Sequence, residues 1–170
     1  MSSNSNIIAL TMGDPSGVGT EIAIRAKIKK IKKPDFFIIH DIDFVKKILK
    51  KMKSKLKVRE ISSPSEVKKL PKNYLAVLPI KISKNTQLGK KNLSNVKSIL
   101  KSIDLAVKLA KNGEVAAIVT NPINKDVIGK KVKNFKGHTE YLAKKDRTND
   151  QLLSLIHISS PRDLSTYRMP

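Results

Sequence analysis

The chain has 170 residues and no cysteine, and its 35 lysines and arginines against 14 acidic residues give a formal net charge of +21. This length suits one moderate hydrophobic core and is short for two complete domains. A hydrophobic content of 39% argues against disorder, and no apolar run is long enough to span a bilayer. The N-terminus lacks the features of a signal peptide. We therefore expect a soluble, cytoplasmic protein without disulfides or thiolate metal sites.

The positive charge raises the question of a nucleic-acid-binding module, because clustered lysines release counterions from phosphates. The chain holds 30 lysines but only 5 arginines, and aromatic residues make up 4% of it. Base readout favours arginine, and single strands need aromatic stacking platforms. The lysines are also spread along the chain. We interpret them mainly as solvated surface that can steer anionic substrates.

The first predicted elements alternate between apolar strands and helices. Residues 6–13 are predicted to form a buried strand that ends in the loop "GDPSGVG". A helix is expected to begin at Thr20 as its N-cap and to continue until Pro34. Residues 35–40, "DFFIIH", predict a second strand. A lysine-rich amphipathic helix is predicted over residues 43–56.

The same alternation continues along the chain. Residues 57–62 and 74–80 predict further strands, and residues 92–113 form the clearest helix, with an Asn-Gly C-cap. The apolar run of residues 114–123 predicts another buried strand, which ends at an Asn-Pro pair. Strands that are apolar on both faces and alternate with amphipathic helices indicate an α/β protein with a mainly parallel sheet.

Composition changes abruptly near the end of the chain. All 30 lysines occur by Lys145, whereas residues 151–170 contain none and are rich in serine, leucine and proline. We therefore divide the chain into residues 1–145 and an atypical tail, residues 146–170. We expect the tail to be the product of a frameshift, a truncated gene prediction or read-through into foreign sequence.

Two loops that follow predicted strands could carry chemistry. In "TMGDPSGVGTE", Gly13 to Gly19 lie between a strand and a helix, so backbone N–H groups could face an anion. The pattern is neither a Walker A loop nor G-x-G-x-x-G, and a tight turn that needs glycine explains it equally well. In "VTNPINK", the polar residues Thr120, Asn121, Asn124 and Lys125 follow the end of a predicted buried strand. They too are expected at the carboxyl edge of the sheet. Lys125 could pair with an anionic group, although a solvated lysine is the simpler interpretation.

A third loop, "NFKGHTEYLA", places His138 and Thr139 in what looks like the first turn of a helix. A neutral imidazole and a hydroxyl at a helix start can both bond a phosphate or carboxylate. For this motif alone, a capping threonine beside an exposed histidine is the simpler interpretation. His40 ends an apolar strand and is expected to have a satisfied role in the core or at its edge, while His157 lies in the tail. The three histidines therefore show no metal-ligand spacing.

Together and in this order, the three loops resemble the signature segments of the 4-hydroxythreonine-4-phosphate dehydrogenase family, and the likeness runs from residue 6 to about residue 143. The resemblance implies a two-domain α/β/α architecture like that of isocitrate and isopropylmalate dehydrogenases, here truncated, and a homodimer at full length. On this resemblance His138 and Thr139 match the family's substrate-binding pair. Lys125 and the Gly13–Gly19 loop match segments that line the cleft, and no catalytic or cofactor-binding residue is assigned.

The resemblance also implies a reaction, in the biosynthesis of pyridoxine and pyridoxal phosphate (vitamin B6). An NAD(P)-dependent oxidation of the C3 hydroxyl of 4-phosphooxy-L-threonine gives a β-keto acid, which loses carbon dioxide to form 3-amino-2-oxopropyl phosphate. A divalent metal ion (Zn, Mg or Co) would polarise the hydroxyl and then the ketone, and NAD or NADP would take the hydride.

The sequence departs from the family in its second half. Family members are about twice as long, and their three metal-binding histidines follow the "GHTE" segment, so we expect no metal ligands in this chain. The family's first domain also draws strands from the C-terminal part. We therefore expect an unprotected sheet edge and an uncovered apolar face here, and a 170-residue chain that is unstable and inactive alone.

Three alternatives stay open beside this interpretation. The first is a dehydrogenase of the same family that acts on another phosphorylated four-carbon hydroxy acid. The second is a phosphate acyltransferase of related fold, which would need no nicotinamide. The third is the nucleic-acid-binding module. The favoured interpretation predicts a phosphorylated small-molecule substrate and neither a nucleic-acid nor a membrane partner.

Overall fold

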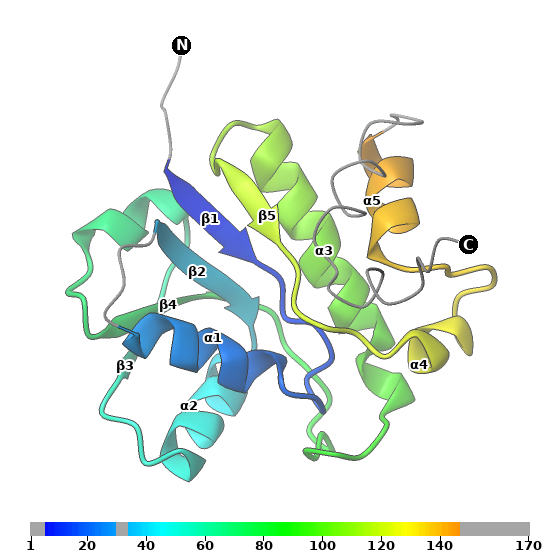
Figure 1. The fold of residues 1–170 in the computed structure, drawn as a ribbon, viewed down its shortest axis with the longest axis horizontal. Coiled ribbons are helices and arrows are strands. Elements are labelled where there is room, and N and C mark those ends of the chain that lie inside the picture. Colours follow the sequence, from blue (N-terminus) through cyan, green and yellow to red (C-terminus); the bar gives the residue numbers. More distant parts are fainter. Residues whose placement is uncertain (1–5, 30–33, 147–170) are drawn as a thin grey trace, which may run out of the picture.

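A computed structural model describes residues 6–29 and 34–146 of the protein. It shows a parallel sheet with helices on both faces (Figure 1). The strands are β1 (Ile7–Leu10), β2 (Asp35–His40), β3 (Lys57–Glu60), β4 (Tyr74–Pro79) and β5 (Ala117–Val119). The helices are α1 (Gly19–Ile28), α2 (Ile42–Lys51), α3 (Val96–Lys111), α4 (Lys125–Gly129) and α5 (His138–Asp146), with short 3₁₀ helices η1 (Pro64–Lys69) and η2 (Leu93–Asn95). The predicted α/β class with a parallel sheet is confirmed.

The strand order is β3-β4-β2-β1-β5, and every neighbouring pair is parallel. All five strands therefore end at the same edge of the sheet. The arrowheads of β1, β2 and β5 point toward the side on which α4 lies (Figure 1). The loops that follow these strands converge there, at the edge where open parallel sheets bind ligands.

Two apolar layers hold the helices against the sheet. Along β2, Phe36 and Ile38 pack with α1 and α2, whereas Phe37 and Ile39 pack on the opposite face with α3. This alternation follows from the two-residue period of a strand, and it explains why the strands are apolar on both faces. The predicted lysine-rich helix is confirmed as α2, although it ends at Lys51 rather than at residue 56.

The first helix starts differently from the sequence prediction. α1 begins at Gly19, and its N-cap is Val18, whose side chain makes no capping hydrogen bond. The prediction that Thr20 is the N-cap is therefore wrong. The Thr20 hydroxyl instead lies 2.9 Å from Nε2 of His40, and both side chains are buried. Of the core and edge roles expected for His40, the structure shows the core.

The β5 edge of the sheet is uncovered in the described part of the chain. Residues 114–123 were predicted as a buried strand, but β5 covers only Ala117–Val119, and Val119 is 46% exposed. An apolar groove beside it is lined by Leu10, Ile22 and Pro122, among others. Within residues 6–29 and 34–146, β5 pairs with β1 alone. The expected open edge and apolar face are thus present in the described residues.

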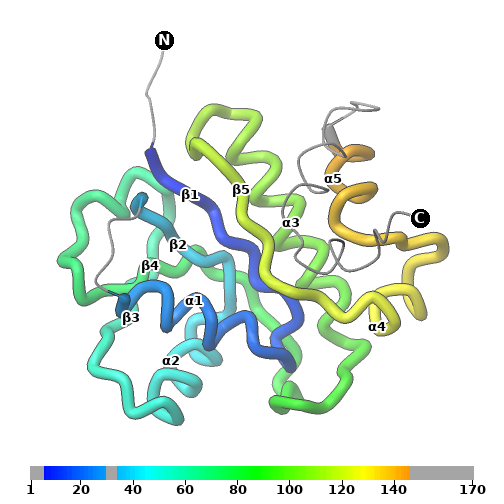
Figure 2. Tube along the Cα trace, viewed as in Figure 1, coloured from blue at the N-terminus to red at the C-terminus, as the bar shows by residue number. Residues whose placement is uncertain are grey.

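The loops that follow β1 and β5 lie in direct contact. The trace in Figure 2 shows the segment after β5 passing alongside the loop after β1 on its way to α4. The amide of Asp14 donates to the carbonyl oxygen of Pro122 at 2.8 Å, and Nδ2 of Asn121 donates to the carbonyl oxygen of Thr11 at 3.0 Å. Gly13 has a φ of +67°, and a Cβ there would lie 2.6 Å from the Pro122 oxygen. Only glycine permits this approach.

This contact predicts an unequal cost of two matched glycine substitutions. Gly113 also has a positive φ, of +72°, but its Cβ would meet open space. Gly113→Ala should therefore lower the free energy of unfolding by about 1 kcal/mol, the cost of the left-handed backbone. Gly13→Ala should cost roughly 2 kcal/mol more, because the two loops must also separate. Urea unfolding of both variants checks this, and equal costs would contradict the close approach.

The buried His40 predicts a pH dependence of stability. Burial lowers its pKa from 6.5 to about 4, against a smaller opposite effect of Asp41. In the unfolded chain the imidazole takes up a proton below pH 6.5, whereas in the folded chain it stays neutral until about pH 4. Stability should therefore fall between these values, by an amount on the order of 3 kcal/mol, since a tenfold change in proton affinity is worth about 1.4 kcal/mol.

The measurement is urea unfolding at several pH values between 7 and 4, on the wild type and His40→Gln. The variant should be less stable at pH 7, but its stability should depend less steeply on pH. His138→Gln serves as the matched control, because it removes a less buried imidazole. An unchanged pH slope in His40→Gln would contradict the neutral, buried state of His40.

Candidate site at the start of helix α5

Helix α5 is docked on α3 by side chains near its middle. The Tyr141 hydroxyl donates to Oδ1 of Asp104 at 2.9 Å, and Nζ of Lys145 lies 3.0 Å from the same oxygen. Burial, and then the Asp104 carboxylate, raise the pKa of Tyr141, so the phenol stays protonated as the donor. The Phe135 ring packs against Tyr141 with ring centroids 5.9 Å apart. These contacts fix where α5 begins, and hence where its first residue, His138, lies.

The second and third predicted loops meet at this point. A Cβ on Gly137 would lie 3.3 Å from Cε and 3.4 Å from Nζ of Lys125, so the amino end of Lys125 lies beside Gly137. Lys125 is the first residue of α4, 12 positions earlier in the chain than Gly137. The structure therefore brings the predicted lysine next to the predicted His138 loop.

His138 has an unsatisfied ring nitrogen. Its Nε2 is buried and has no hydrogen-bond partner among the described residues. Burial, and then the charge of Lys125, lower the pKa of His138, so the imidazole is neutral at neutral pH. Buried polar atoms without a partner are uncommon in folded proteins and call for an explanation. A bound ligand is one.

Thr139 follows as the second residue of α5 and is partly buried. The helix start predicted for this segment is confirmed: the amide of Tyr141 donates to the carbonyl oxygen of Gly137 at 3.2 Å. The amides of His138 and Thr139 belong to the first turn, where helical N–H groups lack partners within the helix. The predicted pair thus lies at the positive end of the α5 dipole.

The other polar residues of the second loop support the backbone. Asn121 is buried against Thr11, as described above, and Oδ1 of Asn124 accepts a hydrogen bond from the Val127 amide at 3.2 Å, which caps α4. Thr120 lines the apolar groove beside β5. Of the four polar candidates in this loop, Lys125 is the one that the described structure brings to His138.

The glycine loop is a tight turn rather than a phosphate cradle. Oδ1 of Asp14 accepts from the Ser16 amide at 2.9 Å, and the Asp14 carbonyl oxygen accepts from the Gly17 amide at 2.9 Å. With the Asp14 amide bonded to Pro122, three amides of the loop are already used. Of the two interpretations that the sequence left open, the structure favours the turn. These three amides are therefore not available to an anion, and we assign the loop no cofactor contact.

Sequence reasoning missed the segment between β4 and α3. Its Gly89 amide donates to the carbonyl oxygen of Ser16 at 2.7 Å, and Nζ of Lys91 lies 3.5 Å from Oδ2 of Asp126 on α4. Asn95, fully buried, accepts from the Ser83 amide at 2.9 Å and holds the segment in place. The one sequence signal was a Gly-Lys turn, which is too common to indicate contact with the glycine loop and with α4.

The described residues contain neither a metal-binding cluster nor a membrane-spanning helix. Within residues 6–29 and 34–146, no three His, Cys, Asp or Glu side chains lie close enough together to hold a metal ion. These residues therefore do not fit the metal expected from the family, and no step is assigned to it. None of the helices in the same part of the chain is long and apolar enough to cross a membrane. His157 and the proposed tail, apart from its first residue in α5, lie outside the described residues.

Known proteins of one family match this chain. The sequence model of "Pyridoxal phosphate biosynthetic protein PdxA" matches residues 32–166. A 4-hydroxythreonine-4-phosphate dehydrogenase of Trichlorobacter lovleyi is 33% identical over 154 residues, which are 87% of this chain and 45% of that protein. The chain therefore spans about half the length of the curated relatives it matches.

Solved structures agree with this assignment. The crystal structure of 4-hydroxythreonine-4-phosphate dehydrogenase from Klebsiella pneumoniae superposes with a TM-score of 0.78 at 29% identity, over 86% of this chain and 46% of that one. A terephthalate 1,2-cis-dihydrodiol dehydrogenase from Burkholderia xenovorans shares the fold, with a TM-score of 0.63 at 18% identity over 84% of this chain and 41% of that one. The family model covers most of the chain, and so the chain belongs to the PdxA family of pyridoxal phosphate biosynthetic proteins.

Proposed function

We propose that this chain is the N-terminal half of a 4-hydroxythreonine-4-phosphate dehydrogenase. The proposed reaction is the NAD(P)-dependent oxidation and decarboxylation of 4-phosphooxy-L-threonine to 3-amino-2-oxopropyl phosphate. The observation that carries the proposal is the buried, unpartnered Nε2 of His138 beside Lys125, at the start of α5. The reaction class comes from the family to which the chain belongs. A cytoplasmic homodimer is part of the same proposal and rests on the resemblance alone.

The site suits an anionic group of the substrate. The ammonium group of Lys125 and the positive end of the α5 dipole both attract negative charge. The neutral His138 ring can donate one hydrogen bond, and the Thr139 hydroxyl can donate another. A bound phosphate or carboxylate would satisfy the free Nε2 and offset the cost of burying it. His138 and Thr139 are therefore proposed to bind substrate, and Lys125 to supply the charge.

The cofactor would accept the hydride from the C3 hydroxyl carbon. The part of this chain that the structure describes supplies no set of metal ligands, and we assign none of its residues to the cofactor. In our proposal, residues beyond those described here provide both functions. The role of this half is to bind and orient the anionic substrate. The 170-residue chain alone should therefore not catalyse the reaction.

One alternative keeps the same site and changes the substrate. A dehydrogenase for another phosphorylated four-carbon hydroxy acid would use the same anion contacts, because they recognise charge rather than the carbon skeleton. The dihydrodiol dehydrogenase neighbour indicates that the fold also serves a different substrate in that protein. A nucleic-acid-binding module is a weaker alternative, because His138 and Lys125 form a single small site rather than an extended surface. A phosphate acyltransferase is a weaker alternative, because the similar proteins are named dehydrogenases.

The test of the proposed function begins with the intact locus. The reading frame is resequenced across codon 150, and the polypeptide it encodes is expressed beside the 170-residue chain. With 4-phosphooxy-L-threonine and NAD or NADP, we expect reduced nicotinamide to form with the intact polypeptide and not with the 170-residue chain. Turnover of a different phosphorylated hydroxy acid would favour the alternative substrate. Turnover by the 170-residue chain itself would contradict the proposed division of roles.

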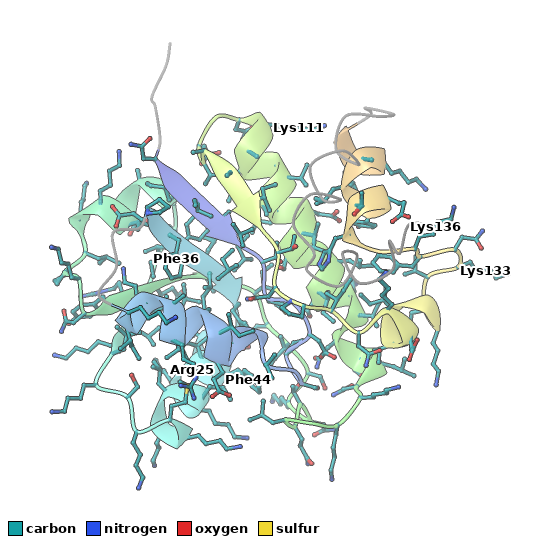
Figure 3. All side chains as sticks on the ribbon, in the orientation of Figure 1. Arg25, Phe36, Phe44, Lys111, Lys133 and Lys136 are labelled. Atoms are coloured by element: carbon teal, nitrogen blue, oxygen red, sulfur yellow. The ribbon has the colours of Figure 1, made fainter. Side chains whose placement is uncertain are left out.

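Substrate affinity should depend on His138 and Lys125. In the intact polypeptide, His138→Ala and Lys125→Met should each raise the Kd of the phosphorylated substrate about 10- to 100-fold, because each removes a hydrogen bond or charge contact to an anion. The matched control is Lys133→Met, which removes the same charge from an exposed side chain that extends away from the body of the protein (Figure 3). Isothermal titration calorimetry measures the three constants. Equal affinities in Lys125→Met and Lys133→Met would rule out a local role for Lys125.

A further inference from the structure

We infer that His40 is a positioning residue of the proposed site. His40 acts through the Thr20 hydroxyl, and this contact fixes the start of α1 against the loop that holds Asn121. His40 and Thr20 are 20 positions apart, and their side chains meet at the ligand-binding edge of the sheet. The inference rests on the proposed function in one respect only, that Lys125, which follows Asn121 in the same loop, belongs to the site. Its physical content can be tested without turnover.

The hydrogen bonds of His40 define one tautomer. Nδ1 accepts from the Asp41 amide at 2.7 Å, so this nitrogen carries no proton. In a neutral imidazole the proton then lies on Nε2, which donates to Oγ1 of Thr20 at 2.9 Å. Burial lowers the pKa of His40 to about 4, which keeps the ring neutral near pH 7. On this geometry Nε2 of His40 is the donor and Oγ1 of Thr20 is the acceptor.

The donor ring has little freedom to move. His40 is the last residue of β2, and its carbonyl oxygen accepts from the Ile80 amide at 3.0 Å. Its ring stacks on Phe44 of α2 with centroids 5.5 Å apart and planes 6° apart. His40 and Thr20 are each only 1% exposed. The sheet and α2 together hold the imidazole in place.

On its other side the start of α1 is in close contact with the second loop. A Cβ on Gly19 would lie 3.0 Å from Cβ of Asn121 and 3.2 Å from the carbonyl oxygen of Met12. Gly19 precedes Thr20, so the helix start is held between Asn121 and His40. Because the N-cap Val18 makes no side-chain capping bond, the Thr20 hydrogen bond takes over the anchoring that a capping side chain normally provides.

The role is tested by hydrogen exchange on the intact polypeptide. Thr20→Val keeps the shape of the side chain and removes the acceptor, whereas the matched Thr20→Ser keeps the hydroxyl. We expect the amides of residues 17–22 to exchange about 10-fold faster in Thr20→Val, and near the wild-type rate in Thr20→Ser. The amides of β4 and of the C-terminal half of α3 serve as the reference. Their exchange rates should change only as far as the global stability of each variant changes.

Two results would overturn the inference. Equal acceleration of exchange at all amides in Thr20→Val would indicate a general loss of stability. Unchanged exchange at residues 17–22 would indicate that the hydrogen bond does not anchor the start of α1. If Thr20→Val does not fold, the nitrogen chemical shifts of wild-type His40 decide the direction of the bond, because a proton on Nδ1 would leave Nε2 as the acceptor of the Thr20 hydroxyl and would contradict the direction proposed here.

Turnover assays on the same samples separate this inference from the proposed function. If the wild type turns over, the KM for the substrate should rise in Thr20→Val and recover in Thr20→Ser. If the wild type does not turn over, the proposed function fails while the exchange test still decides the role of His40.

Discussion

The site depends on one steric constraint, the absence of a side chain at Gly13. Because no Cβ stands between the Gly13 backbone and the Pro122 carbonyl, the loop after β1 can hydrogen-bond to the loop after β5. That contact sets the path of the chain into α4, and with it the position of Lys125. His138 then reaches Lys125 because α5 is docked on α3 through Asp104. The charge and the ring nitrogen of the site thus come from two independently anchored segments.

The electrostatics of the site follow from this arrangement. A lysine beside a half-buried histidine disfavours the imidazolium form, and burial acts in the same direction. The pair therefore carries one positive charge rather than two at neutral pH. A site of this kind attracts a single anionic group and still offers a neutral ring nitrogen for a hydrogen bond. The many other lysines provide a diffuse positive field, which affects the rate of encounter more than the geometry of binding.

Much of the fold could be predicted from patterning. The apolar run in "DFFIIH" and the apolar stripes of α2 and α3 predicted the layers, and three motifs in order predicted the family. Patterning could not give the ends of elements that tertiary contacts decide. Thr20 has the composition of an N-cap, but the partner of its hydroxyl is His40, which no local pattern connects to it. Likewise the run "EVAAIVTNPI" is as apolar as a central strand, and only the strand order shows that β5 lies at the edge. The contact of Lys125 with the His138 loop also depends on how α5 docks, which the sequence does not encode locally.

The groove beside β5 has a consequence for the fate of the polypeptide in a cell. α1 is apolar on two sides, since Ala23 and Ile24 are buried while Ile22 and the N-cap Val18 are largely exposed. A helix of this kind normally has cover on both sides. Any form of the polypeptide that leaves the groove open presents an apolar strip beside an unpaired strand edge, the combination that templates strand addition. Such a form is a ready substrate for chaperones and proteases. Its abundance would then be set by quality control rather than by the rate of its synthesis.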